Sequence, residues 1–141
     1  MSRILLLEDD LSLINGLTFT FKKQGHEADI ARTLDEAEKI WSDGKYDLLI
    51  LDVSLPDGSG FDFCKMVRQV SRVPIIFLTA SDEETSIIMG LDMGGDDYIT
   101  KPFKLGVLIS RINALLRRVK DFGTADTELQ SNGIRVLLLQ G

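Results

Sequence analysis

The chain has 141 residues, enough for one domain and a fragment of a second. Hydrophobic residues make up 44% of it and charged residues 27%, which excludes a disordered chain. Because no apolar stretch is long enough to span a bilayer and no cationic leader opens the sequence, we expect a cytoplasmic protein without membrane contact. The only cysteine, Cys64, excludes an intramolecular disulfide and a multi-cysteine zinc site.

Charge is unevenly distributed along the chain. The net charge is −6, from 22 acidic and 16 basic residues, which disfavours nonspecific binding to nucleic acid. Residues 101–120 nevertheless carry six basic residues and no acidic residue. A basic segment beside an acidic remainder indicates an interaction face rather than a surface that reads a nucleic-acid groove.

Strand and helix patterns alternate along the first 120 residues. Apolar runs with the length of buried strands occur at residues 4–7, 28–31, 46–51, 74–78 and 98–99. A helical pattern follows each run, at residues 11–24, 33–44, 61–70, 83–93 and 105–119. Thr33 and Glu36 form a capping box at the start of the second helical pattern, and Gly25 ends the first.

This alternation predicts an α/β fold in which helices cover both faces of a five-stranded parallel sheet. Right-handed crossovers leave few arrangements for five strands and five helices. The doubly wound, flavodoxin-like order 2-1-3-4-5 is the leading one. We therefore expect residues 1–120 to form one domain.

Residues 121–141 do not continue the pattern. Segment 121–127 is polar and contains a glycine, which is typical of a linker, and 134–139 is a strand-like run. Because an isolated strand cannot bury itself, we expect residues 128–141 to be the truncated start of a second domain. The alternative is a tail that folds back on the first domain.

Polar residues follow four of the predicted strands: Glu8 and Asp9, Asp52, Thr79, and Lys101. The carboxyl ends of parallel strands meet at one edge, so these side chains should lie together. Two carboxylates ~4 Å apart repel by about 4 kcal/mol at an effective dielectric of 20, so a cluster of three predicts a bound cation or raised pKa values. Oxygen ligands without His or Cys favour Mg²⁺ over zinc. A cation beside a carboxylate, a lysine and a hydroxyl is typical of phosphoryl transfer, in which the carboxylate can be the nucleophile.

At these positions the chain resembles the response-regulator receiver domains of bacterial two-component signalling. The matching segments are 4–10 (ILLLEDD), 51–58 (LDVSLPDG), 78–80 (LTA) and 95–103 (GDDYITKPF). The residues around Asp97 and the pair Arg117 and Arg118 further resemble the winged-helix transcription-factor branch of OmpR/PhoB type. In that branch the next segment opens a DNA-binding effector domain, which would be missing here after residue 141.

The resemblance implies a role for each site residue. Asp52 would accept a phosphoryl group from a sensor histidine kinase. Mg²⁺ would be held by Asp9, Asp52 and the backbone carbonyl of Ser54, and by Glu8 through water. Lys101 would pair with the phosphoryl oxygens, and its bond to the following proline would be cis. Such a domain catalyses only its own phosphorylation and dephosphorylation, so we expect no enzyme in the usual sense.

The resemblance also implies a switch and a dimer. Thr79 would bond the phosphoryl group and Tyr98 would move inward from an exposed rotamer, after which a symmetric homodimer forms and the effector domain controls promoter DNA. In that branch the dimer face carries a base on the fourth helix and an acid at the start of the fifth. Those positions hold Ile87 and Val107, whereas another customary pair, Asp97 and Arg111, is retained. We expect the same dimer face with an apolar contact.

Other interpretations stay open, both for single residues and for the function of the chain. Asp9 or Asp10 could cap the first helix, Asp52 could form a turn, and Thr79 and Tyr98 could be core residues. A phosphatase of the haloacid-dehalogenase type needs a second aspartate where Ser54 stands, and an electron carrier of flavodoxin type needs a phosphate loop instead of three acids. The serious rival is a receiver-like interaction module that is never phosphorylated.

Overall fold

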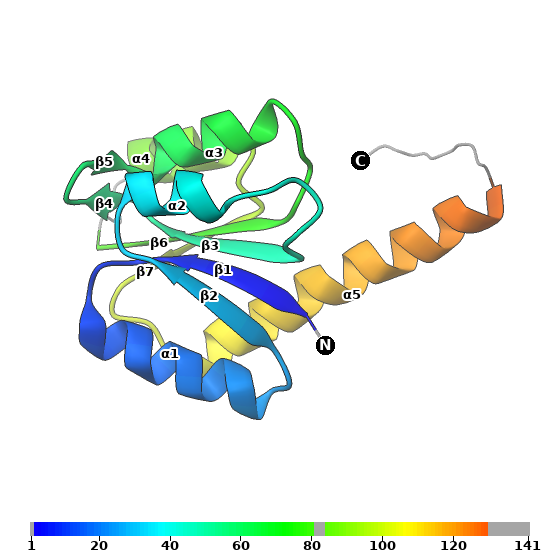
Figure 1. The fold of residues 1–141 in the computed structure, drawn as a ribbon, viewed down its shortest axis with the longest axis horizontal. Helices are drawn as coiled ribbons and strands as arrows, with labels where there is room; N and C mark the ends of the chain where they lie inside the picture. Colours follow the sequence, from blue (N-terminus) through cyan, green and yellow to red (C-terminus); the bar gives the residue numbers. More distant parts are fainter. Residues whose placement is uncertain (1, 81–83, 130–141) are drawn as a thin grey trace.

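The computed structural model describes residues 2–80 and 84–129. Five strands form the main sheet and five helices surround it (Figure 1). The strands are β1 (Arg3–Leu7), β2 (Glu27–Ala31), β3 (Leu48–Asp52), β6 (Ile75–Thr79) and β7 (Asp97–Thr100), and a small hairpin pairs β4 (Ser54–Leu55) with β5 (Gly58–Ser59). The helices are α1 (Leu11–Lys23), α2 (Leu34–Ile40), α3 (Gly60–Arg68), α4 (Glu84–Asp92) and α5 (Leu105–Leu129).

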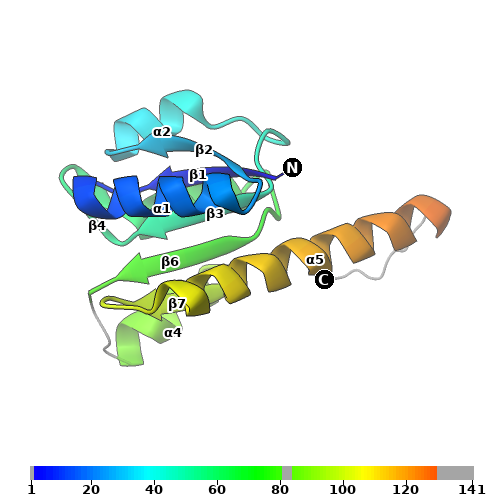
Figure 2. The same ribbon diagram turned by 90° about the horizontal axis from the view of Figure 1, so that it is seen from below.

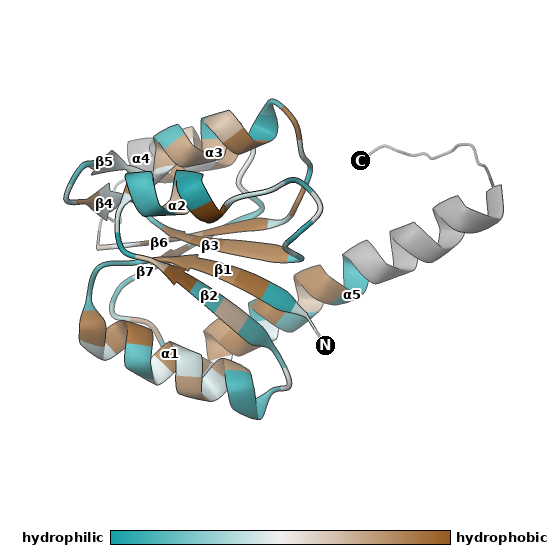
Figure 3. Ribbon diagram, viewed as in Figure 1, coloured by the Kyte–Doolittle hydropathy of each residue, from teal (hydrophilic) through white to brown (hydrophobic). Residues whose placement is uncertain are grey.

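The sheet order is β2-β1-β3-β6-β7, and every neighbouring pair is parallel. This confirms the doubly wound order that the sequence predicts. All five residues of β3 and of β6 are buried, as both faces of a central parallel strand are covered by helices. The hydropathy colouring shows mostly hydrophobic central strands and helices that mix hydrophobic with hydrophilic residues (Figure 3).

Two apolar cores lie on the two faces of the sheet. Helices α1 and α5 cover one face, and α2, α3 and α4 cover the other (Figures 1 and 2). Successive strand residues point to opposite faces, so Ile4 and Leu6 pack in the first core and Leu5 and Leu7 in the second. The layers fix the carboxyl ends of the strands at one rigid edge.

Two helix ends differ from the sequence prediction. Helix α2 ends at Ile40 instead of near residue 44, because Trp41 takes an extended backbone and its ring stacks on Tyr46, with ring centroids 6.2 Å apart. Helix α5 continues to Leu129, through the predicted linker 121–127. That segment holds one glycine and no proline, so nothing in it breaks helical hydrogen bonding strongly.

The expected start of a second domain at 128–141 lies almost wholly outside the described residues and stays a prediction. Within residues 2–80 and 84–129, no helix has the length and apolar character needed to cross a membrane.

Candidate functional site

The strands end at the edge where the sequence predicts a cluster of polar side chains. Glu8 follows β1, Asp52 ends β3 and Thr79 ends β6, and their exposed fractions are 0%, 5% and 2%. Asp9 is half-buried beside Glu8. Carboxylate oxygens of Glu8, Asp9 and Asp52 lie within 4.8 Å of one another. We call these three residues the acidic cluster.

Lys101 follows β7 and supplies positive charge at this edge. Its Nζ lies 2.9 Å from Oε1 of Glu8 and 3.4 Å from Oδ2 of Asp52. Its backbone amide donates to the Thr79 carbonyl at 2.7 Å, and its peptide bond to Pro102 is cis, as the resemblance implies. Lys101 therefore bridges two of the three carboxylates.

The acidic cluster holds more negative charge than one lysine neutralises. Burial, together with the hydrogen bond and the negative charge of Glu8, raises the pKa of Asp52 to about 6, against the opposing effect of Lys101. Burial works against the charge on Lys101, but its hydrogen bond to Glu8 and the charge of Asp52 outweigh burial and raise the pKa of Lys101. A divalent cation would remove the excess charge. Three oxygen ligands without nitrogen or sulfur fit a hard cation rather than zinc.

The third consecutive acid has a different place. Asp10 precedes α1, and its carboxylate accepts hydrogen bonds from the amides of Ser12 and Leu13, so it is the N-cap of that helix. Oε2 of Glu8 accepts from the amides of Asp9 and Asp10, both at 3.1 Å, which orders the loop between β1 and α1. Glu8 and Asp9 are left to face a cation.

The segment after β3 folds closely against Asp52. A Cβ atom on Gly60 would collide with the backbone carbonyl of Asp52, so only glycine allows the chain to return here. The amide of Ser54 donates to Oδ1 of Asp52 at 3.3 Å. Ser54 is exposed and pairs with Ser59 in the β4–β5 hairpin. The hairpin places the Ser54 backbone beside the acidic cluster.

Tyr98 lies on β7 with half of its side chain buried. Its ring centroid is 6.3 Å from that of Phe77, and Phe77 packs edge-on against Phe61 at 5.0 Å. A Cβ atom on Gly90 would lie 3.1 Å from the Tyr98 ring, so α4 passes close over this aromatic group. The ring therefore packs against Phe77 while half of the side chain stays exposed, and the inward movement of Tyr98 stays a prediction.

Strand β7 is an edge strand of the sheet, and α4 and α5 flank it from the two opposite faces (Figures 1 and 2). We call this side of the molecule the α4–β7–α5 face. On it, Nη1 of Arg111 lies 2.7 Å from Oδ2 of Asp97, so this customary pair links α5 to β7 within one chain. Val107 is 45% exposed and Ile87 is half-buried. Further exposed apolar residues on these helices are Ile88, Met89, Leu91 and Leu105.

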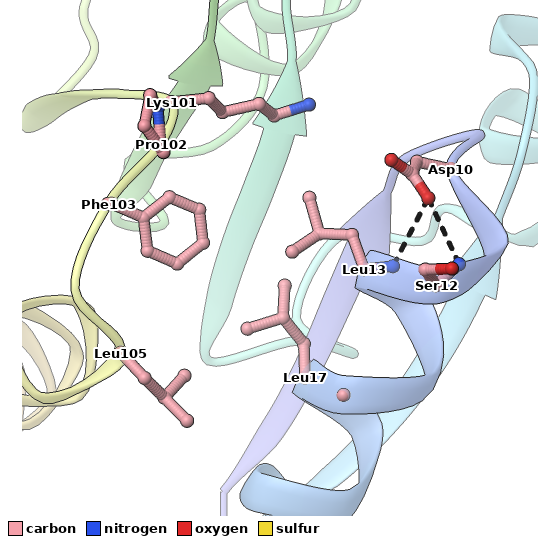
Figure 4. Close-up of a pocket in the computed structure, with 9 residues that line it drawn as sticks. Asp10, Ser12, Leu13, Leu17, Lys101, Pro102, Phe103 and Leu105 are labelled. Atoms are coloured by element: carbon pink, nitrogen blue, oxygen red, sulfur yellow. Dashed lines mark hydrogen bonds between the residues drawn. The ribbon is translucent and has the colours of Figure 1, made fainter.

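A hollow of about 520 Å³ lies between the start of α1 and the segment after β7 (Figure 4). Its walls are mostly apolar, with Leu13 and Leu17 of α1 on one side and Phe103 and Leu105 on the other. Lys101 also lines it. An apolar depression thus adjoins Lys101, which contacts two carboxylates of the acidic cluster.

Sequence reasoning missed two residues that hold the loops of the site. Nη2 of Arg32 donates to the backbone carbonyl of Asp9 at 3.0 Å, and the Asp57 carboxylate accepts from the amides of Leu34 and Asp35. Asp57 lies inside segment 51–58, which carries the family resemblance, but neither it nor Arg32 is marked by its residue type, because an arginine after a strand and an aspartate in a turn are ordinary surface residues. Each contact joins positions 22 or 23 residues apart in the sequence, and only folding brings such positions together.

The chain was compared with known protein families. The sequence model of the response regulator receiver domain matches residues 4–113. The chain belongs to that family. A receiver domain of a two-component response regulator is not an enzyme in its own right, and its acidic cluster is compatible with Mg²⁺.

Relatives of this receiver domain include transcriptional regulators. The chain is 41% identical over 123 residues to the uncharacterized transcriptional regulatory protein YclJ of Bacillus subtilis, covering 87% of the chain and 54% of YclJ. It is 39% identical over 139 residues to the sensory transduction protein RegX3 of Mycolicibacterium smegmatis, covering 96% of the chain and 61% of RegX3. A crystal structure of a two-component response regulator from Clostridium difficile superposes with a TM-score of 0.79 at 38% identity, covering 84% of this chain and 98% of that one. The chain therefore spans little more than half the length of these curated relatives.

Proposed function

We propose that Asp52 accepts a phosphoryl group from the phosphohistidine of a sensor histidine kinase, and that this switches a transcription regulator of OmpR/PhoB type. The observation that carries the proposal is the buried Asp52 carboxylate, which lies in a cluster with Glu8 and Asp9 and 3.4 Å from Lys101. An oxygen of Asp52 forms a bond to phosphorus while the phosphorus–nitrogen bond of the phosphohistidine breaks, and the electron pair of that bond stays on the imidazole.

The residues of the site divide the work of this step. Asp9, Asp52 and the backbone carbonyl of Ser54 would hold Mg²⁺ directly, and Glu8 would hold it through water. When bound, Mg²⁺ offsets the negative charge of the carboxylates and of the transferred group. Lys101, which already reaches two carboxylates, pairs with the phosphoryl oxygens.

The switch follows from the position of β6 and β7 beside Asp52. Thr79 ends the strand next to Asp52 in the sheet and donates its hydroxyl to the phosphoryl group. Tyr98 follows toward Thr79, and α4 shifts with it because Gly90 packs on the Tyr98 ring. The α4–β7–α5 face then forms a symmetric homodimer, with Ile87 and Val107 in an apolar contact and Asp97 and Arg111 at its polar part.

The kinase docks along α1 in this proposal. The hollow between α1 and the segment after β7 lies directly beside Lys101. Phe19 is 64% exposed and follows Gly16 of the hollow by three residues, so both lie on the same stripe of α1. In the parent protein, a winged-helix effector domain binds promoter DNA in the cytoplasm.

Intact mass spectrometry tests the phosphoacceptor directly. Incubation with Mg²⁺ and acetyl phosphate should add one phosphoryl group to the wild-type chain and none to Asp52→Asn. A chelator should abolish the addition, because the step needs the cation. Wild-type protein that stays unmodified with acetyl phosphate and with phosphoramidate would instead favour a receiver-like interaction module that works without phosphorylation.

A further inference from the structure

The residues proposed to hold the cation lie on the β1–α1 loop (Glu8 and Asp9), at the end of β3 (Asp52) and at the start of the β4–β5 hairpin (Ser54). The beginning of α2 contacts both the β1–α1 loop and this hairpin. On the first loop, Nη2 of Arg32 donates to the Asp9 carbonyl at 3.0 Å. The backbone amide of Arg32 donates in turn to Oε1 of Glu36 at 2.7 Å, inside the first turn of α2. The amide of Glu8 donates to the carbonyl of Ala31 at 3.0 Å. The β1–α1 loop is thus tied to the residues that start α2.

The second loop is tied to the same helix turn from the other side. Asp57, at the tip of the β4–β5 hairpin, accepts hydrogen bonds from the amides of Leu34 at 2.8 Å and Asp35 at 3.2 Å. These amides have no acceptor within the helix, because they belong to its first turn. A Cβ atom on Gly58 would lie 2.7 Å from the Leu34 side chain, so the hairpin tip lies directly on α2. The hydrogen bond from the Leu34 amide also lowers the pKa of Asp57, which keeps its carboxylate charged.

The contacts at the start of α2 oppose the electrostatic repulsion within the acidic cluster. Its three carboxylates repel one another, and the repulsion acts between the β1–α1 loop and the end of β3. Lys101 counteracts it for Glu8 and Asp52. The loop that carries Asp9 is held instead through its backbone, by Arg32.

We propose that Arg32 and Asp57 are positioning residues that hold the two loops at the separation a divalent cation requires. We call this pair the loop brace. The inference rests on the proposed function in taking Mg²⁺ as the cation. Ligands that are held in place before binding lose less conformational freedom when the cation binds, so the loop brace raises cation affinity without touching the cation.

Arg32→Met separates geometry from charge, because the two effects have opposite signs. Removing a positive charge near a cation site strengthens cation binding by electrostatics alone. Releasing the Asp9 loop weakens it, and partners of metal ligands typically change affinity by roughly tenfold or more. We expect isothermal titration calorimetry with MgCl₂ to show about tenfold weaker binding. The rate of phosphorylation by acetyl phosphate should return to the wild-type value at saturating Mg²⁺.

Asp57→Ala tests the contact between the β4–β5 hairpin and α2, and Asp35→Asn is its matched control. Both remove one carboxylate at the start of α2, but Asp35 pairs with Lys39 at 2.9 Å on its own helix. Asp57→Ala should weaken Mg²⁺ binding about as much as Arg32→Met does, and Asp35→Asn should bind as the wild type does. Melting temperatures in EDTA show whether each variant is folded.

The outcomes distinguish this inference from the proposed function. If wild-type protein binds Mg²⁺ and is phosphorylated, but Arg32→Met and Asp57→Ala bind Mg²⁺ as tightly as the wild type, the loop brace is overturned and the proposed function stands. If Arg32→Met binds more tightly, charge dominates and the loop brace is again overturned. If the wild-type chain binds no Mg²⁺, the proposed function fails and this inference fails with it.

Discussion

At the scale of a single residue, Asp52 is a carboxylate that folding makes less acidic. Its pKa is about 6 in the folded chain and ordinarily 3.8, so the folded state binds more protons than the unfolded state between these values. The free energy of unfolding therefore falls as pH rises from about 4 to about 6. A pKa shift of this size corresponds to a loss of about 1–3 kcal/mol. Asp52→Asn removes the titration. In EDTA, we expect the variant to be about 1–3 kcal/mol more stable than wild type at pH 7.5 and equally stable at pH 4, as measured by urea unfolding.

Asp35→Asn serves as the control for this measurement, because the Asp35 side chain is 66% exposed and pairs with Lys39 on the surface. It should leave the free energy of unfolding almost unchanged at both pH values. An Asp52→Asn variant that is less stable than wild type at pH 7.5 would contradict the raised pKa of Asp52, since it would mean that the buried charge stabilises the fold.

At the scale of an element, α1 has an inner face in the core and an outer face that carries an exposed aromatic side chain. Phe19 is 64% exposed, and Nζ of Lys23 lies 5.1 Å from its ring centroid. If the kinase docks along this helix, Phe19→Ala should slow phosphotransfer from a kinase that phosphorylates the wild-type chain by roughly tenfold, the usual effect of losing an aromatic anchor. Phosphorylation by acetyl phosphate, which needs no docking surface, should proceed at the wild-type rate.

Val70→Ala is the matched control, since Val70 is 61% exposed and lies outside α1. It should change neither rate. Equal slowing with both phosphoryl donors in Phe19→Ala would mean that the substitution damages the fold or the site, and kinase docking along α1 would lose its support.

The elements also show what the sequence can and cannot predict. Strand order and the polar residue after each strand follow from periodicity and chain direction, so the meeting of Glu8, Asp52 and Lys101 could be predicted. The contacts of Arg32 and Asp57 could not, because they depend on how one loop lies on the first turn of a helix from another part of the chain. Composition suggested a linker at 121–127, but a segment without proline continues the helix that precedes it.

At the scale of the whole molecule, the proposed dimer makes the α4–β7–α5 face the surface that would decide which chains can pair with this one. A symmetric dimer brings each residue near the axis close to the same surface of its partner. Val107 is 45% exposed on this face, and Asp97 and Arg111 already form a 2.7 Å pair within the chain. An apolar contact at Val107 would leave a charged residue at the same place on another chain without a partner, so it would favour pairing between identical chains.

Val107→Glu tests this contact, because it would place a carboxylate from each chain in an apolar interface. After activation with acetyl phosphate and Mg²⁺, we expect analytical ultracentrifugation to show dimerisation weakened by at least about tenfold, which corresponds to roughly 1.4 kcal/mol. Val70→Glu makes the same change on an exposed valine that lies outside α4, β7 and α5, and should dimerise as the wild type does. Wild-type dimerisation should persist at high salt, since salt screens the charges of Asp97 and Arg111 but not the apolar contact at Val107. Unchanged dimerisation of Val107→Glu would place the dimer contact elsewhere on the molecule.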